Sequence, residues 1–335
     1  RRKSLCEILK NGEMVKINSV LRFLKFKEIG ALIALLVIFV FFDILNSEFI
    51  TISNLTTILE TSAELGIMTL GVNLVMITGE FDMSVASIYI LVPVIFEFLT
   101  LWGIPSIISM VIALLFAAGQ GFVNGFITTK GHIPSFITTL GTEYLWLGVT
   151  LAITSGYFIS LTKGKDIINI FSAPIGSTDL RVSVLWFIGL TIVFYLIIEK
   201  TKYGNRVMAS GGNPAVADSL GVQSWKYKTS AFMISGITAG LAGFALFGRF
   251  QSIDTSFGTG MELQSITASV IGGTLMTGGY GSAFGAFLGA IILSSLDNGL
   301  VLVGAPTFWY QAFVGIILVA AALLNIKLKT SLVGG

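Results

Sequence analysis

Apolar stretches about twenty residues long recur along the whole chain, and no other feature constrains its fold as strongly. A helix of about that length is needed to cross a hydrocarbon core about 30 Å thick. Only 11% of the residues are charged, against roughly a quarter in a soluble protein, and the sequence lacks the alternating pattern of barrel strands. We therefore expect an all-α polytopic membrane protein. The ten predicted spans are residues 29–45, 55–77, 84–101, 105–129, 133–153, 183–198, 229–247, 263–277, 283–303 and 308–325.

The positive charges fall mainly on one side of these spans. If the N-terminus is cytoplasmic, sixteen Lys and Arg residues lie inside, eight of them before residue 28 and five between residues 200 and 228. Only four lie outside: Lys163, Lys165, Arg181 and Arg249. Because basic residues mark cytoplasmic loops, we expect both termini in the cytoplasm and an even number of spans.

No stretch outside the spans is long enough for a second domain. We expect a cytoplasmic basic tail at residues 1–28 and a single transmembrane domain at 29–326, with a cytoplasmic segment at 200–228 within it. The tail is either an amphipathic helix on lipid or a solvated arm. Its Cys6 is the chain's single cysteine, so no disulfide is expected. The loop at 154–182 is expected to carry one short surface helix.

The sequence offers no catalytic or metal centre. Its one histidine, His132, stands at a predicted turn, whereas a zinc site needs several converging ligands. No Gly-x-x-x-x-Gly-Lys-Ser/Thr loop is present to hold ATP, and no Gly-x-Ser-x-Gly elbow or Ser/His/Asp set is recognisable. We expect that the chain is not an enzyme, that it binds no metal or cofactor, and that it has no nucleic-acid partner.

Polar residues inside the predicted spans point to transport. Burying such a group in hydrocarbon is costly unless it faces a cavity or a partner. Together these residues favour a polar pathway between helices, and hence a transporter or channel over a membrane anchor. Residue by residue, hydrogen bonds that hold the bundle together are an equal alternative. The candidate path residues are Glu64, Asn73, Asn124, Glu143 and Asn298.

Glycines four residues apart recur on the predicted helices. Gly121 and Gly125 form one such pair, and Gly285 and Gly289 form another. Small residues at this spacing let helix backbones approach closely in a membrane, where lipid gives helices no hydrophobic reason to associate. We expect these glycines to mark helix contacts, and the 38 glycines of the chain also permit broken helices.

The segment from residue 200 to residue 228 has the pattern of a short helix between two turns. Asn213 can cap the helix, and Pro214 suits its first position, where a missing N–H costs nothing. Gly221 suits a left-handed stop. Such a helix would offer small side chains to a partner's groove; the alternative is an ordinary connecting loop. The expected contact residues are Gly211, Gly212, Asn213, Pro214, Ala215, Ala217, Leu220 and Gly221.

Asp82 and Ser84 stand just before the third predicted span. A short polar side chain at this position can cap exposed backbone N–H groups, and an acid complements the positive end of a helix. We therefore interpret Asp82 as a helix cap, with direct contact to a transported solute as the alternative.

Four stretches follow the motifs of a known family. Residues 78–87 read Thr-Gly-Glu-Phe-Asp-Met-Ser-Val-Ala-Ser and resemble the motif Gly-Gly-Ile-Asp-Leu-Ser-Val-Gly-Ser, which Gly79, Asp82 and Ser84 match. Residues 133–142, 204–221 and 270–285 are similar to three further motifs. The family is that of the permeases of ribose-type ATP-binding-cassette (ABC) importers. Two departures are Glu80-Phe81 for Gly-Ile and Ala86 for Gly.

The resemblance implies a permease of the bacterial cytoplasmic membrane that moves a small polar solute, most simply a pentose or hexose, into the cell. It implies a partner ATPase that binds the ATP and contacts residues 200–228. A second permease copy or paralogue and an extracytoplasmic solute-binding protein complete the assembly in the lipid membrane. Within the family the solute is alternatively a nucleoside, a furanosyl signal molecule or a flavin. An ion-coupled secondary transporter is the rival class.

Overall fold

The structure is a computed structural model that describes residues 28–306 and 308–333. The basic tail before residue 28, including Cys6, lies outside these residues. The principal helices are α2 (Ile29–Leu45), α3 (Ile52–Ile77), α4 (Val85–Leu101), α5 (Ser106–Gly131), α6 (Ser135–Thr154), α8 (Val182–Lys200), α11 (Ser224–Phe250), α12 (Met261–Ile271), α13 (Ala283–Leu302) and α14 (Phe308–Val333). The short helices are α7 (Lys165–Ser172), α9 (Lys202–Gly212), α10 (Pro214–Ser219) and the 3₁₀ helix η1 (Thr255–Gly258).

Nine of the ten predicted spans coincide with helices. By length and composition, six of these helices can cross a membrane: α3, α5, α6, α8, α11 and α13. Helices α2 and α4 are shorter apolar helices, as is the stretch from residue 308 to 320 in α14. The all-α polytopic fold expected from the apolar stretches is therefore confirmed.

The predicted span at 263–277 is wrong as a continuous helix. Helix α12 has 11 residues, which gives a length of roughly 16 Å, and it ends at Ile271. The chain continues as a loop over residues 272–282, in which Gly273, Gly278 and Gly279 have positive φ. Glycine adopts this conformation at no steric cost, so these three glycines interrupt the predicted span, as the many glycines of the chain permit.

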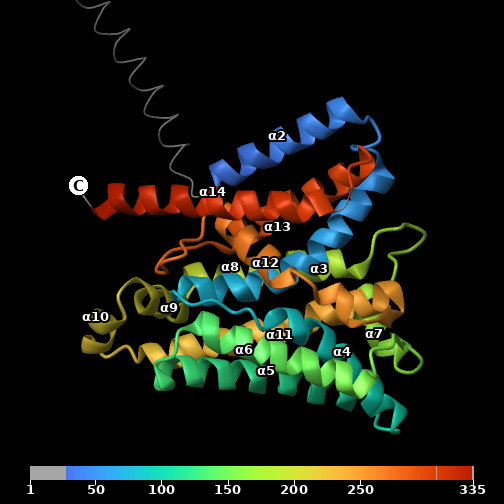
Figure 1. The fold of residues 1–335 in the computed structure, drawn as a ribbon, viewed down its shortest axis with the longest axis horizontal. Helices are drawn as coiled ribbons and strands as arrows, with labels where there is room; N and C mark the ends of the chain where they lie inside the picture. The colour runs from blue at the N-terminus through green and yellow to red at the C-terminus, as the bar shows by residue number, and fades with distance from the viewer. Residues whose placement is uncertain (1–27, 307, 334–335) are drawn as a thin grey trace, which may run out of the picture.

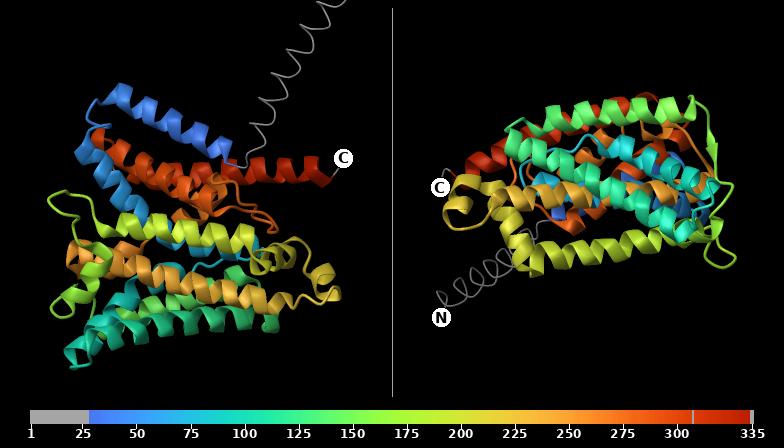
Figure 2. Two further views of the ribbon diagram at one scale, coloured as in Figure 1. Left: turned by 180° about the vertical axis from the view of Figure 1, so that it is seen from behind. Right: turned by 90° about the horizontal axis from the view of Figure 1, so that it is seen from below.

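The helices lie side by side, roughly along the longest axis of the molecule (Figure 1). Helix α11 packs beside α5, and α3 packs beside α11 and α13; the views in Figure 2 show the same neighbours. The glycine spacing explains part of this packing, because a Cβ at Gly121 or Gly125 of α5 would overlap or crowd the backbone of α11.

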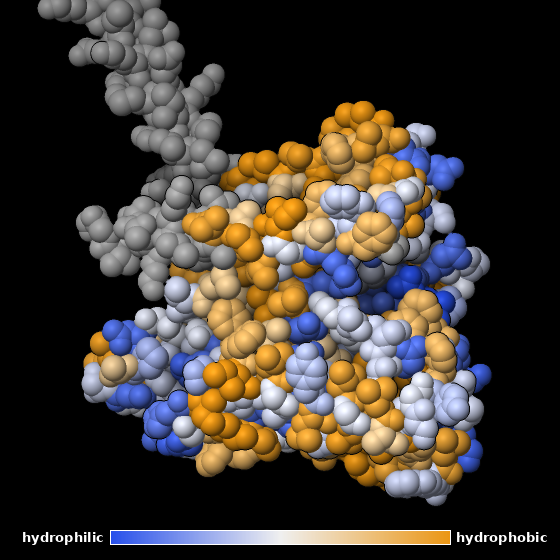
Figure 3. Space-filling model, viewed as in Figure 1, coloured by the Kyte–Doolittle hydropathy of each residue, from blue (hydrophilic) through white to orange (hydrophobic). Residues whose placement is uncertain are grey.

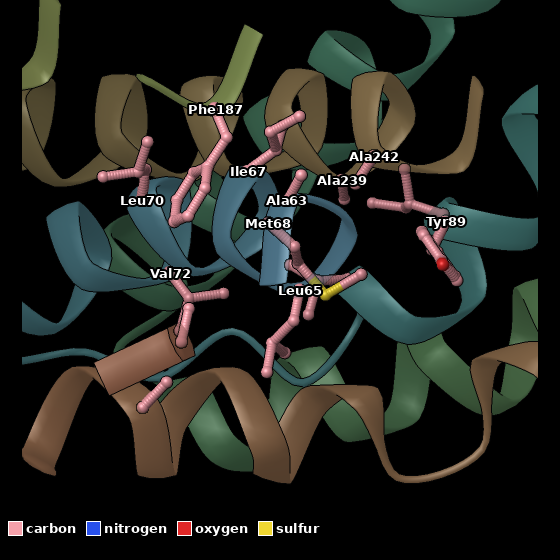
Figure 4. Packing of buried hydrophobic residues seen from close by; sticks show 14 of the residues in the cluster. Ala63, Leu65, Ile67, Met68, Leu70, Val72, Tyr89, Phe187, Ala239 and Ala242 are labelled. Carbon is pink, nitrogen blue, oxygen red and sulfur yellow. The ribbon is translucent and has the colours of Figure 1, made fainter. Parts of the chain in front are cut away.

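Helix α3 is the core of the bundle, with residues 62–77 all buried. A helix buried on every side must be apolar nearly all round. Figure 4 shows its side chains pointing in several directions, towards Phe187 of α8, Tyr89 of α4, and Ala239 and Ala242 of α11. Helix α6 is the opposite, since its buried residues are Ser and Thr and its exposed ones are largely apolar. Apolar side chains also cover much of the surface in Figure 3.

The two ends of the bundle carry different elements (Figure 1). Helices α9 and α10 lie at one end, which we call the α10 end, together with the start of α2 and the last turns of α14. Helix α7 lies at the other end, the α7 end, with the antiparallel pair β1 (Ile159–Ser160) and β2 (Ser252–Ile253). The short surface helix expected in the loop at 154–182 is thus confirmed as α7.

Candidate solute path and coupling segment

Residues 78–84 join α3 to α4 by a non-helical segment that runs from the α10 end towards the middle of the molecule (Figure 1). Non-helical backbone at membrane depth needs protein partners for its N–H groups. Two hydroxyls of α6 accept from them: Ser135 Oγ from the N–H of Phe81, and Thr139 Oγ1 from the N–H of Met83, each at 3.0 Å. Two of the sequence motifs therefore meet in space.

A chain of side-chain hydrogen bonds starts at the fully buried Asp82. Asp82 Oδ1 accepts from the hydroxyl of Ser84 at 2.6 Å and from its backbone N–H at 3.2 Å. Asn124 donates to Ser84 Oγ at 2.8 Å, and Thr142 donates to Asn124 Oδ1 at 2.9 Å. Ser84 is at the N-cap position of α4 but makes no capping hydrogen bond, because its hydroxyl is bonded to Asp82 and Asn124 instead. We call these four residues the Asp82 chain.

Four glycines from three segments meet at the α10 end, and we call Gly79, Gly211, Gly278 and Gly279 the glycine junction. The N–H of Gly279 donates to the carbonyl of Ile77 at 2.8 Å. A Cβ on Gly211 would overlap that same carbonyl oxygen, and a Cβ on Gly278 would lie 2.6 Å from Gly79 Cα. The end of α9 therefore touches both non-helical segments through backbone atoms, with no room for a side chain.

Asn73 of α3 fastens the loop that follows α12. Its Oδ1 accepts from Thr274 Oγ1 at 2.5 Å, and its Nδ2 donates to the carbonyl of Ser282 at 3.3 Å. The residue is fully buried. Both hydrogen-bonding groups of this candidate path residue thus hold the bundle together, as do those of Asn124.

Glu64 belongs to a cluster of four charges towards the α7 end, formed by Glu60, Glu64, Arg181 and Arg249. Arg249 lies 3.4 Å from a carboxylate oxygen of Glu60 and 3.3 Å from one of Glu64, and Arg181 lies 3.6 Å from Glu60. The sequence predicted that both arginines lie outside the membrane and that Glu64 lies inside its span. In the structure, Arg249 nevertheless reaches Glu64 and forms an ion pair with it. Hydrophilic residues also gather in a hollow towards the α7 end in Figure 3.

Glu143 borders a cleft of about 480 Å³ between α4, α6 and the segment around η1. Its Oε2 is buried without a hydrogen-bond partner among the described residues, and so is Oε2 of Glu262 on the cleft's opposite wall. Asn298 does not border the cleft; it lies on α13, where its Oδ1 is likewise unpaired within the described chain. The residues that line the cleft are Ala86, Ser87, Ile90, Glu143, Tyr144, Leu147, Leu151, Thr255, Ser256, Gly258, Thr259, Gly260 and Glu262.

Helix α10 has the local structure that the sequence predicts. Asn213 caps it, accepting the N–H of Val216 at 3.2 Å, and Pro214 is its first residue. Gly221 has the left-handed conformation, with φ of +84°. The helix ends at Ser219, two residues before the predicted stop at Gly221.

The face that α10 presents differs from the prediction. Ala217 is 4% exposed, whereas Leu220 is 78% exposed and Val216 is 51% exposed. The carbonyl of Ala217 also accepts from the N–H of Val222 at 3.0 Å, which holds this part of the helix against the chain that follows. The expectation that Ala217 enters a partner's groove is therefore wrong, and Val216 replaces it beside Leu220 on the exposed face, where Ala215 is also exposed.

The sequence reasoning missed two buried or half-buried carboxylate contacts near the candidate site. Glu80, the departure from the family motif, forms an ion pair with Lys228 of α11 at 2.5 Å, which gives that departure a physical reason. Glu97 is fully buried in α4 and accepts hydrogen bonds from the backbone N–H groups of Thr162 and Lys163, anchoring the loop before α7. A carboxylate inside a predicted span was the signal that would have found Glu97.

The comparisons with known proteins show which family the chain resembles. Residues 54–322 match the family model described as branched-chain amino acid transport system / permease component. The chain is 32% identical to an autoinducer 2 import system permease protein of Photorhabdus luminescens over 91% of this chain and 92% of the relative. It is also 32% identical to the ribose import permease protein of Escherichia coli K12, over 90% of this chain and 94% of the relative. No solved structure matches at a significant level.

Matches to the family model and to whole permeases both span most of the chain, and the apolar helices of the structure fit a multi-pass protein of the bacterial inner membrane. The relatives are transport components, and none of them indicates a catalytic activity for this chain. The chain belongs to the branched-chain amino acid transport system / permease component family, and within it to the ribose-type ABC importer permeases.

Proposed function

We propose that this chain is the subunit through which an ATP-driven importer moves a pentose- or hexose-like solute into the cell. The relatives' names support a sugar, because ribose is a pentose. The glycine junction is the observation that supports the proposed mechanism. It joins the end of α9, next to the exposed helix α10, to two non-helical segments in the bundle. Autoinducer 2 is the second candidate solute, favoured by the relatives that import it.

In this proposal the α10 end is cytoplasmic. Five basic residues lie between residues 200 and 228, and basic loops remain inside. The first and last described helices have their outer ends on the same side as α10 (Figure 1), as an even number of crossings requires. The eighth crossing is made by α12 together with the loop at 272–282. Transporters commonly use such interrupted helices near their solute sites.

Helix α10 is the proposed contact with the partner ATPase, which binds the ATP. Val216 of this helix and Leu220, which directly follows it, are exposed at the tip of the bundle, where apolar side chains can enter a groove of a partner. Movement of α10 would reach α9 directly, because Asn213 links the two helices. From α9 it would pass through Gly211 to residues 78–84 and 272–282.

A second permease copy or a paralogue is proposed to face α6. This helix exposes most of its surface, yet it carries the half-buried Glu143 near its middle. A carboxylate at that depth is costly against lipid, so its face is expected to border a water-filled path or a partner subunit. A solute-binding protein would deliver the solute at the α7 end.

Reconstitution tests the proposal. The chain would be co-purified with its proposed partner ATPase and solute-binding protein and placed in liposomes, and uptake of labelled D-ribose would be measured. We expect uptake with ATP on the ATPase side and none with an ion gradient alone. Uptake driven by an ion gradient without ATP would instead establish the secondary-transporter class.

A further inference from the structure

The cleft beside Glu143 has the size and position of a small-molecule site. Its volume of about 480 Å³ falls in the roughly 300–1,000 Å³ range of ligand pockets. The 3₁₀ helix η1 folds back into the bundle to form one wall, and a Cβ on Gly258 would lie only 2.8 Å from the carbonyl of Ala86. The first turns of α4 and α12 form two other walls, and α6 forms the last.

The polar groups of this cleft are mainly acceptors of hydrogen bonds. Glu143 and Glu262 each hold one carboxylate oxygen that is buried and unpaired within the described chain. A buried acceptor left without a donor costs about 1–3 kcal/mol, so both carboxylates gain from a ligand that brings hydroxyl or other donors. Thr259 and Ser256 add exposed hydroxyls to the rim.

The sign of the charge restricts the ligand further. Among the described residues that line the cleft, two are acidic and none is basic. An anionic solute would be repelled by both carboxylates, while a neutral polyol or a cation would not. Tyr144, Leu147 and Leu151 offer one apolar wall, which fits the carbon face of a ring. The cleft therefore fits a neutral ligand that has many hydrogen-bond donors and one apolar face. An unphosphorylated sugar has these properties, whereas a simple cation does not.

The cleft also touches the Asp82 chain. Ser87 lines the cleft, and its hydroxyl donates to the carbonyl of Ser84 at 2.8 Å. Thr142, the last member of the Asp82 chain, directly precedes Glu143 in α6. A molecule in the cleft would therefore press on the start of α4, which residues 78–84 connect to the glycine junction.

We propose that this cleft is a binding subsite for a neutral, polyhydroxylated solute, in which Glu143 and Glu262 accept hydrogen bonds from solute hydroxyls and exclude anionic solutes such as sugar phosphates. The proposal rests on the import function proposed above and adds to it the site and the charge class of the solute.

Cysteine labelling tests the cleft without any assumption about the solute. Thr259→Cys in a Cys6→Ser background, in the full chain within its complex, would react with a cationic and an anionic methanethiosulfonate reagent. Tyr157→Cys, 74% exposed outside the cleft, is the matched control. We expect the cation-to-anion rate ratio at position 259 to exceed that at 157 by about tenfold. Adding Glu143→Gln and Glu262→Gln should remove most of the excess. Equal ratios at the two positions would overturn the proposal.

Transport supplies the second arm. With labelled D-ribose and ribose 5-phosphate as probes, Glu143→Gln and Glu262→Gln should each raise the KM for D-ribose at least about fivefold. The exposed Asp166→Asn of α7, the matched acidic control, should not change it. Normal KM values in both Gln variants, with wild-type uptake intact, would refute the subsite alone. Absence of ATP-dependent uptake by the wild type would refute the import function, while the labelling ratio would still decide the character of the cleft.

Discussion

Helix α3 is joined to its neighbours by charges in one half and by bare backbone in the other. Towards the α7 end, Glu60 and Glu64 meet Arg181 and Arg249 across 3.3–3.6 Å through long side chains. At the α10 end, the carbonyl of Ile77 meets Gly279 and Gly211 with no side chain between them.

These two kinds of contact differ in how they respond to movement. An arginine can rotate and keep its ion pair while helices shift by an ångström or more, whereas close-packed backbone has no such slack. The glycine junction is therefore suited to pass a displacement of α9 and α10 into the bundle, and the charge cluster is suited to keep α3, α8 and α11 together while it happens. The α10 end of α3 is therefore expected to tolerate substitution less than the α7 end.

The largest effect is expected at Gly211. Its replacement by Ala adds a Cβ that overlaps the carbonyl oxygen of Ile77, and we expect a loss of about 3 kcal/mol in stability, seen as a large fall in thermal unfolding temperature or in folded yield in detergent. Gly212→Ala is the matched control, because a Cβ there would lie 3.7 Å from Gly279 Cα, an ordinary contact. Equal behaviour of the two variants would mean that the junction is not tightly packed.

Arg249 should give the next largest effect. Arg249→Met leaves the two carboxylates of Glu60 and Glu64 with Arg181 alone, and breaking a buried pair is destabilising. Because the Arg249 side chain is 18% exposed, we expect about 2 kcal/mol, measured by chemical unfolding. Adding Glu64→Gln should recover part of the loss. No recovery in the double variant would show that lost packing, not unpaired charge, explains the defect.

The third prediction concerns Lys228 of α11. Its ion pair with Glu80 ties α11 to the segment at 78–84, which starts beside the glycine junction. Lys228→Met should cost about 1 kcal/mol at low salt, read from the unfolding temperature. The cost should shrink little at high salt, because both side chains are under 20% exposed and poorly screened. Lys202→Met, at an exposed lysine of α9, is the control. A cost that vanishes at high salt would place this pair among ordinary surface contacts.

Asp218 should give the smallest effect, and one that depends on pH. The backbone N–H and hydroxyl of Ser224 donate to its carboxylate and lower its pKa below the ordinary 3.8. A carboxyl whose pKa is lowered on folding stabilises the fold above its ordinary pKa, and the contribution disappears as pH falls through the lowered value. We therefore expect Asp218→Asn to increase amide hydrogen exchange at residues 217–224 at neutral pH. The difference from wild type should narrow below about pH 4; a difference that persists there would contradict the assignment.

The sequence was informative where a feature depends on neighbouring residues or on hydrophobicity. Apolar stretches located nine helices, and the order Asn213, Pro214, Gly221 located α10 with its cap and stop. The predictions failed where contacts between distant parts of the chain decide which residues are exposed or where a helix ends. Ala217 looked available because it is small, but its smallness serves packing against its own chain. The span at 263–277 looked continuous because glycine is common in membrane helices, and only the backbone shows that it is broken there.

For the candidate path residues, too, one property could be predicted from the sequence and another could not. Their depth in the membrane was readable from the spans, but their partners were not. Asn73 and Asn124 bond to neighbouring segments, Glu64 pairs with Arg249, and Glu143 borders the cleft. Nothing in the spacing of Glu143 and Glu262 along the chain indicates that they line the same cleft, because the fold of η1 brings Glu262 there.

Helix α10 is the proposed surface through which the ATPase moves this subunit, and cross-linking tests this contact most directly. In the Cys6→Ser background, single cysteines at positions 216, 217 and 220 would be treated with a short bifunctional reagent in the intact complex. We predict strong cross-links to the ATPase from 216 and 220, whose native side chains are exposed, and weak ones from the buried 217. An absence of cross-links from both 216 and 220 would contradict this assignment of α10.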